Sequence, residues 1–386
     1  MDKITLIASA TMGLESIVAD ELRALGYENI KTLNGKVEFE GTIKDIVKAN
    51  IWLRCADRIY IKMGEFKATS FEELFQGTTK IAWEKLIPVD GEFPVTWISS
   101  VKSQLFSKSD SQAIIKKSIV ERLKTVYNVD YFKETGPLYR IKVQILNDIV
   151  TLQVDTSGEA LHKRGYRAKN NDAPIKETLA AALIYLTKWK GEGYPFIDPT
   201  CGTGTLPIEA ALIAKNIAPG VNRRFSAEKW PLIPENMWLE TRDEAYTFEK
   251  EDEGIEIFGS DIDGQVIELA RDNAEKAGVD HLIKFEQKHL VEIYNYTKSP
   301  YGVIISNPPY GDRLEDQEKA EKLYRLLGDV CRKFKDWSYY AITSNENFQK
   351  EFDMKATKNR KLYNGGIKCY YYQYWPKKTR KTFTYG

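Results

Sequence analysis

The sequence is poor in the residues from which metal sites and disulfide frameworks are built. Its 386 residues include four cysteines and three histidines, scattered along the chain and without any Cys-x-x-Cys pair. The spacing therefore predicts neither disulfides nor a zinc site. With so few nitrogen and sulfur ligands, a metal-dependent mechanism has little support in the sequence.

Long apolar runs and a strong net charge are also missing. No run approaches the roughly 20 residues that cross a bilayer. The start, residues 1–7, reads as a first strand and not as a signal peptide. These absences predict a cytoplasmic protein with no membrane partner. The formal net charge is only +1, so the chain as a whole lacks the usual charge of nucleic-acid-binding proteins.

The charge is distributed unevenly along the chain. Residues 162–169 hold four basic side chains and no acidic one, and residues 351–386 hold nine basic and two acidic ones. Residues 240–256, in contrast, hold eight acidic and two basic side chains. The basic segments could bind phosphate or could be ordinary solvated surface, and the sequence leaves both interpretations open.

Alternating strand and helix patterns run through the chain. In the first 155 residues they predict small mixed α+β units, a size that suits an RNA-binding module. Asn147-Asp148 lies between two alternating runs and predicts a β-hairpin. A closing antiparallel hairpin is predicted around 364–366, and we interpret Tyr370, Tyr371, Tyr372 and Tyr374 as edge-strand packing in preference to a base-stacking platform. The predicted strands are 4–9, 37–39, 93–99, 138–146, 149–154 and 338–343; the predicted helices are 14–25, 43–53, 111–126 and 175–189.

A glycine-rich turn, residues 199–204, follows a short apolar strand that ends in Asp198. The turn leads into a helical pattern over 206–215. Strand, glycine turn and helix form the nucleotide-binding arrangement of doubly wound sheets. Only Gly202 and Gly204 are present, so the dinucleotide fingerprint is incomplete and a nicotinamide cofactor is disfavoured. The pattern suits S-adenosylmethionine, which has no phosphate to bind.

Two further strand ends carry polar residues. Residues 255–260 read as a strand that ends at Asp261, whose carboxylate could accept hydrogen bonds from both ribose hydroxyls of a nucleoside. Asp263 is better explained as the N-cap of a helix over 264–277. A third strand, 283–287, leads to His289. Three strand ends in register predict one cofactor site.

Asn307-Pro308-Pro309-Tyr310 follows an apolar strand over 302–306. An exocyclic base amine is a poor nucleophile because its lone pair is delocalised into the ring. The Asn307 side-chain oxygen and the Pro308 carbonyl could accept its N–H groups and localise that lone pair. Tyr310 offers a flat face on which a flipped base could stack. The motif predicts methylation of a base amine, although a structural Pro-rich turn would read the same way.

Together these motifs resemble the THUMP-domain class of Rossmann-fold RNA methyltransferases. The resemblance is to the bacterial branch that methylates guanine N2 in 23S ribosomal RNA, and it covers essentially the whole chain. It rests also on residues 11–15, 56–58, 161–167 and 173–177. It implies an α/β fold, in which a Rossmann-like domain with a seven-stranded mixed sheet follows α+β segments. The implied domains are 1–60, ferredoxin-like; 61–155, THUMP, RNA-binding; 156–172, a bridge; and 173–386, the methyltransferase domain, with a structured insertion near the site over 216–254.

The resemblance also implies roles for individual residues. His289 stands where the family usually carries an Asp against the cofactor adenine. Cys201 stands where the family has a small residue, so we do not assign it as a nucleophile. Lys163, Arg164 and Arg167 are predicted to bind RNA, but could instead hold the bridge between domains; Arg313 could contact a phosphate or pair with a nearby acid. The catalytic set is Asn307, Pro308 and Tyr310; the cofactor set is Asp198, Thr200, Cys201, Gly202, Thr203, Gly204, Asp261, Ile262, His289 and Asn307.

Several functions compete at this level. The leading hypothesis is methyl transfer from S-adenosylmethionine to guanine N2 of structured RNA, with ribosomal RNA favoured and transfer RNA as an alternative. Adenine-N6 methylation of DNA is a second hypothesis, and a catalytically decayed RNA-binding assembly factor is a third. The N-terminal 155 residues favour RNA over DNA, and the intact glycines, Asp261 and Asn307 argue against decay. The choice of guanine over adenine rests on the resemblance and not on the tetrapeptide.

Overall fold

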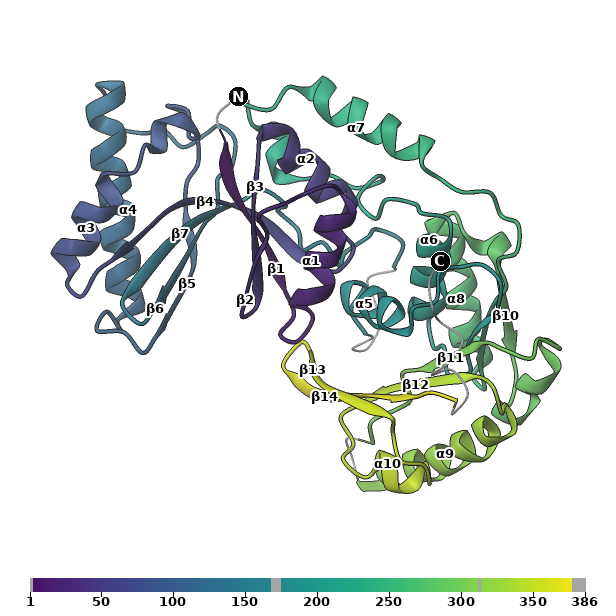
Figure 1. The fold of residues 1–386 in the computed structure, drawn as a ribbon. Coiled ribbons are helices and arrows are strands. Elements are labelled where there is room, and N and C mark those ends of the chain that lie inside the picture. The colour runs from purple at the N-terminus through teal and green to yellow at the C-terminus, as the bar shows by residue number, and fades with distance from the viewer. Residues whose placement is uncertain (1–2, 168–174, 312–313, 377–386) are drawn as a thin grey trace. The chain divides into compact units, whose positions relative to one another are not determined.

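The computed structural model describes residues 3–167, 175–311 and 314–376, which fold into two compact units (Figure 1). The N-terminal unit comprises Met1–Ala10, Val18–Leu161 and Arg223–Asp243. The C-terminal unit comprises Thr11–Ile17, His162–Asn222 and Glu244–Gly386. None of the described helices is long and apolar enough to cross a bilayer.

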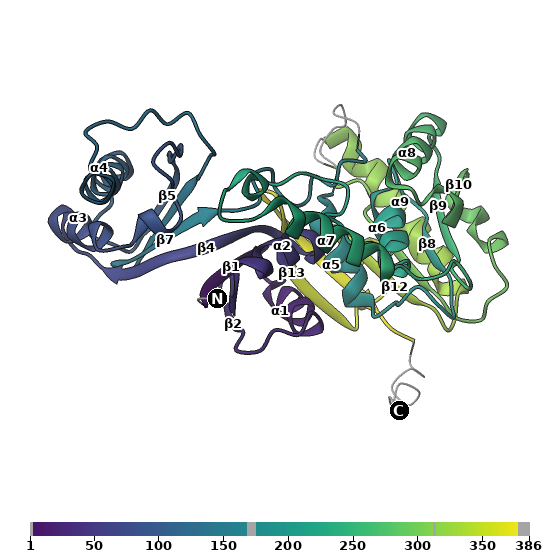
Figure 2. The same ribbon diagram turned by 90° about the horizontal axis from the view of Figure 1, so that it is seen from above.

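One seven-stranded sheet organises the N-terminal unit, in the order β2-β3-β1-β4-β7-β6-β5. The long strand β4 pairs antiparallel with β1 on one side and with β7 on the other (Figure 2). The boundary predicted at residue 60 falls inside β4. The elements are β1 (Ile4–Ala10), α1 (Glu15–Ala24), β2 (Lys31–Leu33), β3 (Lys36–Gly41), α2 (Ile43–Trp52), β4 (Ala56–Lys67), α3 (Phe71–Thr79), the 3₁₀ turn η1 (Trp83–Lys85), β5 (Val95–Val101), α4 (Lys108–Tyr127), β6 (Ile141–Leu146) and β7 (Ile149–Asp155).

The hairpin predicted around Asn147-Asp148 is confirmed. These two residues join β6 and β7 with φ angles of +51° and +62°. Consecutive left-handed residues give the turn the twist of the strands that it joins, and Asn and Asp adopt this conformation at low cost. The low cost of left-handed backbone angles for Asn and Asp therefore explains both the sequence signal and the observed turn.

The insertion, residues 216–254, is structured, and none of its residues lines the candidate site. Its central part, 223–243, packs within the N-terminal unit, where Trp230 stacks on Tyr139 with ring centroids 4.7 Å apart. The Trp230 indole N–H donates to the Leu138 carbonyl at 3.1 Å. Phe225 and Trp238 are also buried and stack at 5.2 Å. Phe225, Trp230 and Trp238 thus complete the core of the N-terminal unit. Its elements are the 3₁₀ turn η2 (Ser226–Lys229) and α7 (Glu235–Thr247).

The C-terminal unit contains the predicted seven-stranded mixed sheet, in the order β10-β9-β8-β11-β12-β14-β13. The pairs from β10 to β12 are parallel, and the β13–β14 hairpin closes one edge antiparallel. The elements are α5 (Glu177–Thr187), β8 (Phe196–Asp198), α6 (Thr205–Ala214), β9 (Ile257–Asp261), α8 (Gly264–Ala277), the 3₁₀ turn η3 (Asp280–Leu282), β10 (Ile283–Gln287), the 3₁₀ turn η4 (Leu290–Asn295), β11 (Val303–Ser306), α9 (Leu314–Lys333), β12 (Ser338–Thr343), α10 (Phe348–Glu351), β13 (Lys358–Asn364) and β14 (Ile367–Tyr374).

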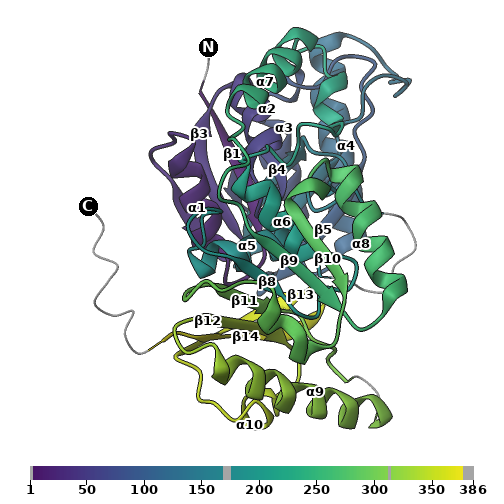
Figure 3. The ribbon, with the colours of Figure 1, turned by 90° about the vertical axis from the view of Figure 1, so that its right-hand side faces the viewer.

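Helices cover both faces of this sheet. In Figure 3, α5, α6 and α8 lie on one face, and α9 and α10 lie on the other. The central strands β8 and β11 are buried along their whole length, which explains why they read as continuous apolar runs and not as alternating patterns. Parallel strands joined by helices bring their carboxyl ends to one edge of the sheet, and this edge carries the polar residues singled out in the sequence.

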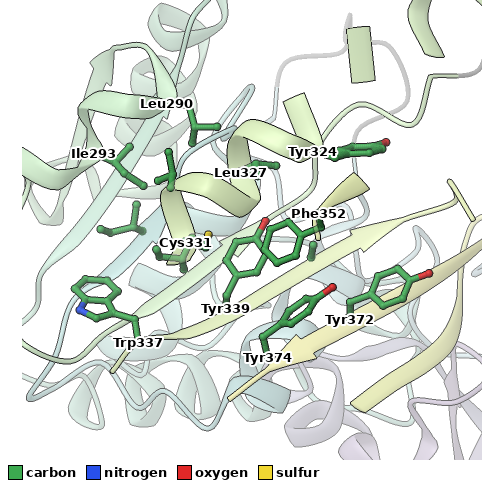
Figure 4. Packing of buried hydrophobic residues seen from close by; sticks show 14 of the residues in the cluster. Leu290, Ile293, Tyr324, Leu327, Cys331, Trp337, Tyr339, Phe352, Tyr372 and Tyr374 are labelled. Atoms are coloured by element: carbon green, nitrogen blue, oxygen red, sulfur yellow. The ribbon is translucent and has the colours of Figure 1, made fainter. Parts of the chain in front are cut away.

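An aromatic core fills the space between the sheet and helices α9 and α10 (Figure 4). Tyr339 stacks on Phe352 at 4.8 Å, and Tyr372 stacks on Phe348 at 5.2 Å. The edge-strand packing predicted for the tyrosines of β14 is confirmed for three of them, since Tyr371, Tyr372 and Tyr374 are buried. Tyr370 is only half-buried.

We expect Trp230→Ala to loosen the 223–243 segment. The substitution removes a stacked ring and an indole hydrogen bond from a fully packed position, a change that costs about 3–5 kcal/mol. Hydrogen exchange measured by mass spectrometry should show faster exchange within 223–243. Trp375→Ala, which alters a 44% exposed tryptophan, serves as the control. Unchanged exchange in the Trp230 variant would show that the stack does not hold the segment.

Candidate functional site

A cavity of about 930 Å³ opens where β8, β9 and β11 end. The chain continues from β8 and β11, which are neighbours in the sheet, to opposite faces, and open α/β sheets bind ligands at such a switch point. The volume lies within the range of about 300–1,000 Å³ that holds small organic ligands. The structure brings together these predicted residues in its lining: Asp198, Thr200, Cys201, Gly202, Thr203, Asp261, Ile262, His289, Asn307, Pro308 and Tyr310.

The loop between β8 and α6 is held by hydrogen bonds to the acidic side chains. The Thr200 amide N–H donates to Asp198 Oδ1 at 3.1 Å, and the Gly202 amide N–H donates to Asp261 Oδ2 at 3.1 Å. Gly202 has a φ of +51°, and a Cβ at this position would meet no atom within 4 Å. The loop therefore presents its backbone to open space in the cavity, which allows a ligand to approach closely.

Gly204 has a different role from the one predicted, because it does not line the cavity. Its φ is +84°, and a Cβ there would lie 2.9 Å from Phe285 Cζ and 3.0 Å from Ala270 Cβ. A glycine is required where α6 begins so that the helix can pack closely against β10 and α8. The second glycine of the turn is thus explained by packing and not by ligand contact.

Asp261 retains capacity for a ligand after its internal hydrogen bonds are counted. Oδ2 accepts from Gly202, and Oδ1 accepts the Asp263 amide N–H at 3.1 Å. A carboxylate has about four acceptor positions, so two remain. Such a carboxylate at a cavity wall can accept two hydroxyl groups of a ribose. Asp263 is the N-cap of α8, as predicted, and its side chain accepts from the Gln265 N–H at 2.8 Å.

His289 and Ile262 complete this side of the cavity. His289 caps η4, and its Nδ1 accepts the Val291 N–H at 3.4 Å. Its main-chain N–H donates to Glu292 Oε1 at 3.0 Å. Ile262 is 68% exposed although it is large and apolar, and it lines the cavity. An exposed aliphatic side chain beside a capping histidine offers an apolar surface with one polar edge, which suits a heteroaromatic ring.

The Asn307–Tyr310 loop is fixed in its present shape by contacts from its own residues and from behind. The Tyr310 hydroxyl donates to Asn307 Oδ1 at 3.0 Å and so orients the amide. The buried Tyr324 of α9 donates its hydroxyl to the Pro309 carbonyl at 2.6 Å (Figure 4 shows Tyr324 at the edge of the aromatic core). Asn345 Nδ2 donates to the Tyr310 carbonyl at 3.3 Å. Sequence reasoning missed Tyr324 and Asn345, since no spacing connects them to the tetrapeptide.

Burial raises the pKa of two groups, one at the end of β8 and one in the loop that follows it. Burial raises the pKa of the Asp198 carboxyl well above its usual range, the Thr200 amide opposes the shift, and the negative charge of Asp261 adds to it. Burial and the charges of the same two aspartates raise the pKa of the Cys201 thiol well above its usual range. A nucleophilic cysteine needs an accessible thiolate, so Cys201 is a neutral small residue of the loop and not a nucleophile.

The predicted RNA-binding arginines of the bridge are internal. Arg164 retains only 3% of its side-chain exposure, and its Nε lies 3.5 Å from Oε1 of the fully buried Glu209. Arg167 Nη2 donates to Thr205 Oγ1 at 2.6 Å, and its Nε lies 3.5 Å from Glu177 Oε1. Of the two roles considered for these arginines, the structure supports the structural one. Their guanidinium groups pair with carboxylates and with Thr205 at the start of α6. The prediction that these two arginines contact RNA phosphates is therefore wrong.

The other two predicted RNA contacts have different outcomes. Lys163 is exposed, which is consistent with either role. Arg313 lies outside the described residues. Within the described part of the chain, no three His, Cys, Asp or Glu side chains gather as a possible metal site.

Family comparisons agree with this geometry. Residues 164–373 match the family model described as the RMKL-like methyltransferase domain, 5–60 match an RlmL ferredoxin-like domain, and 68–155 match a THUMP domain. The protein named "Putative RNA methyltransferase YpsC" from Bacillus subtilis (strain 168) is 48% identical over 379 residues. That match covers 98% of this chain and 97% of the relative.

Solved structures give the same result over the whole chain. A "predicted N6-adenine-specific DNA methylase" from Listeria monocytogenes str. 4b F2365 superposes with a TM-score of 0.92 and 49% identity, covering 97% of each chain. SMU.472, "a putative methyltransferase complexed with SAH", superposes with a TM-score of 0.90 and 42% identity, covering 97% of this chain and 99% of that one. The chain belongs to the RMKL-like family of S-adenosylmethionine-dependent methyltransferases, with RlmL ferredoxin-like and THUMP domains before the catalytic domain.

Proposed function

We propose that the protein transfers a methyl group from S-adenosylmethionine to the N2 amine of a guanine in structured RNA, with 23S ribosomal RNA as the substrate. One observation carries the proposal: the acidic strand ends Asp198 and Asp261 and the Asn307–Tyr310 loop line the same cavity. A donor site and an amine-binding loop are therefore within reach of one another. The THUMP domain and the RNA methyltransferase named among the relatives support RNA as the substrate.

On the donor side, the free acceptor positions of Asp261 bind the ribose hydroxyls. Ile262 and His289 contact the adenine, and the backbone of residues 200–203 contacts the methionine part. Asp198 lines the cavity at the start of this loop and supplies a negative charge once it is ionised. Two carboxylates at one cavity suit a cationic ligand, since opposite charges attract. S-adenosylmethionine carries two cationic groups, a sulfonium and an ammonium. Its product, S-adenosylhomocysteine, has lost the sulfonium charge.

On the acceptor side, Asn307 Oδ1 and the Pro308 carbonyl accept the two N–H groups of the base amine. An amide oxygen has two lone pairs, and the Tyr310 hydroxyl uses one in the present structure. The amine lone pair forms a bond to the methyl carbon while the carbon–sulfur bond breaks and its electrons remain on sulfur. The methylated nitrogen then releases a proton to water. Orientation and preorganised acceptors supply the rate, and no strong base is required.

Adenine-N6 methylation is the alternative to consider, because the Listeria relative carries that name. The acceptors of the Asn307–Tyr310 loop suit the N2 amine of guanine and the N6 amine of adenine equally. The THUMP domain argues for RNA in preference to DNA. Transfer RNA is a second possible RNA substrate, which the same experiment distinguishes.

The direct test is transfer of label from S-adenosylmethionine to hypomethylated ribosomal RNA, followed by nucleoside mass spectrometry. N2-methylguanosine in ribosomal RNA is the expected product. N2-methylguanosine in transfer RNA alone would mean that transfer RNA, and not ribosomal RNA, is the substrate. N6-methyladenosine would mean that the methylated base is adenine. No transfer to any of ribosomal RNA, transfer RNA or duplex DNA would refute the proposed activity.

Asn307→Ala should lower kcat by about a hundredfold or more, because removing one preorganised polar group from the reacting atoms has an effect of this size. The dissociation constant for S-adenosylhomocysteine should change much less. Tyr310→Phe, which keeps the ring and loses only the hydroxyl that orients Asn307, should have a smaller effect on kcat. Equal losses in both variants would mean that the Tyr310 hydroxyl is needed to orient the amide, whereas a wild-type kcat in Asn307→Ala would contradict a direct role for Asn307.

S-adenosylmethionine should bind more tightly as the pH rises. In the free protein the Asp198 carboxyl holds its proton above the usual range, whereas a cationic ligand favours the ionised form. Binding therefore releases a proton, and the dissociation constant should fall by up to about tenfold per pH unit below the pKa of Asp198. Calorimetry between about pH 5 and 7.5, below the titration of the ligand's α-amino group, measures this.

Asp198→Asn is the matched variant for this measurement, because Asn preserves an acceptor for the Thr200 N–H and cannot ionise. The variant should bind the cofactor weakly and with little dependence on pH. S-adenosylhomocysteine, which lacks the sulfonium charge, should show a shallower pH dependence with the wild type. A wild-type affinity that is constant with pH would contradict this role of Asp198.

A further inference from the structure

The β13–β14 hairpin carries two lysines and two tyrosines on one of its faces. Lys361 is paired with Tyr370, and Tyr363 is paired with Lys368. Residues paired directly across antiparallel strands point to the same face, and so do residues two apart on one strand. Lys361, Tyr363, Lys368 and Tyr370 therefore share one face, and we refer to these four residues as the hairpin face.

Each lysine of the hairpin face lies beside a tyrosine ring. Lys368 Nζ is 4.9 Å from the Tyr370 ring centroid, and Lys361 Nζ is 5.7 Å from that of Tyr363. Both lysines are exposed and both tyrosines are half-buried. Tyr370 packs on one side against the aromatic core through Tyr372, and the two lysines reach solvent. Cations that alternate with rings are the composition that binds unpaired nucleotides, since phosphates pair with the cations and bases stack on the rings.

The ion pair between Lys368 of the hairpin face and its acidic partner Glu346 is weak. Lys368 Nζ lies 3.3 Å from Glu346 Oε1, and the two side chains are 42% and 75% exposed. Exposed ion pairs of this kind contribute little to stability and are screened by salt. A phosphate can therefore replace Glu346 as the partner of Lys368 at small cost.

The hairpin face begins next to the proposed base-binding loop. Cys369 lies between Lys368 and Tyr370 on β14, and its Sγ is 3.7 Å from the Tyr310 hydroxyl oxygen, on the face of the strand opposite the hairpin face. On the hairpin face itself, the link to the loop runs through Glu346, the partner of Lys368. Asn345, the neighbour of Glu346, donates to the Tyr310 carbonyl. A nucleotide chain whose target base stacks on Tyr310 would thus have its flanking nucleotides beside β14.

We propose that the hairpin face binds the single-stranded RNA nucleotides that flank the methylated base. Lys361 and Lys368 contact phosphates, and Tyr363 and Tyr370 stack on bases. An enzyme that draws one base out of its stack must hold the backbone on either side of it, and unpaired RNA exposes base faces for this purpose. The inference rests on the proposed methylation of RNA and specifies where that RNA is held.

Edge strands also carry lysines for another reason, because an exposed charge prevents pairing with other sheets. This explanation makes no distinction between the two faces of the hairpin. Lys358 is on β13 too, but its pairing with Gln373 places it on the opposite face from Lys361. Lys355 precedes the strand and is exposed. Lys355→Ala/Lys358→Ala therefore removes the same charge from the hairpin and the segment directly before it, and is a matched control for Lys361→Ala/Lys368→Ala.

The test measures binding of hypomethylated ribosomal RNA to the full chain, saturated with S-adenosylhomocysteine, at several salt concentrations. Lys361→Ala/Lys368→Ala should reduce the slope of log affinity against log salt by about 1.4, at roughly 0.7 for each lost contact to single-stranded phosphate. Tyr370→Leu, which preserves bulk but not stacking, should weaken RNA binding at least about fivefold. Affinity for S-adenosylhomocysteine should stay at the wild-type value in each variant and so reports correct folding.

The inference would be overturned by equal salt slopes in the two double variants, or by wild-type RNA affinity in Lys361→Ala/Lys368→Ala. Both results would mean that these lysines are edge charges. Failure of the proposed function has a separate signature, because it concerns methyl transfer by the wild type and not RNA affinity of the variants. A wild type that binds RNA with the predicted salt dependence but transfers no methyl group would support RNA binding by the hairpin face and refute the proposed methyl transfer.

Discussion

The parallel pairing of β8 with β11 is the constraint on which the site depends. These strands are adjacent in the sheet but distant in sequence, and Val303 pairs with Phe196 and Ile304 with Ile197. Continued by one residue, this register places Asp198 level with Ile305, so the loop after β8 and the Asn307–Tyr310 loop leave the sheet at the same edge. The chain then leaves the two strands toward opposite faces, which keeps the space between the loops open. Neither loop would form a site without the other.

Much of the site was predictable because its residues lie at strand ends, where sequence and structure are closely connected. Asp198, Asp261 and Asn307 each follow an apolar run, and parallel strands of one sheet must end at the same edge. Gly202 and Gly204 looked alike in the sequence, but one faces open space and the other packs against Phe285. Only the tertiary structure distinguishes a glycine that leaves room for a ligand from one that allows a helix to pack closely.

Other features were not predictable because they depend on partners distant in sequence. Arg164 and Arg167 lie in a basic segment that reads as surface, yet Glu209 and Glu177, on helices that follow, neutralise them in the interior. Charge alone does not reveal burial when the opposite charges come from elsewhere in the chain. Strand β4 was missed for a related reason: its second half alternates polar residues on an exposed face, and its role in joining two modules depends on pairing with β1 and β7.

The 223–243 segment also affects the order in which the protein can fold during synthesis. Tyr139 and Leu138 are in the N-terminal unit, but the ring and the indole N–H that cover them come from Trp230, which is made after β8 and α6 of the C-terminal unit. When only the first 161 residues have left the ribosome, Tyr139 therefore lacks the ring that covers it. Nascent chains with exposed apolar surface are those that chaperones bind. The N-terminal unit cannot be completed until part of the C-terminal unit has already emerged.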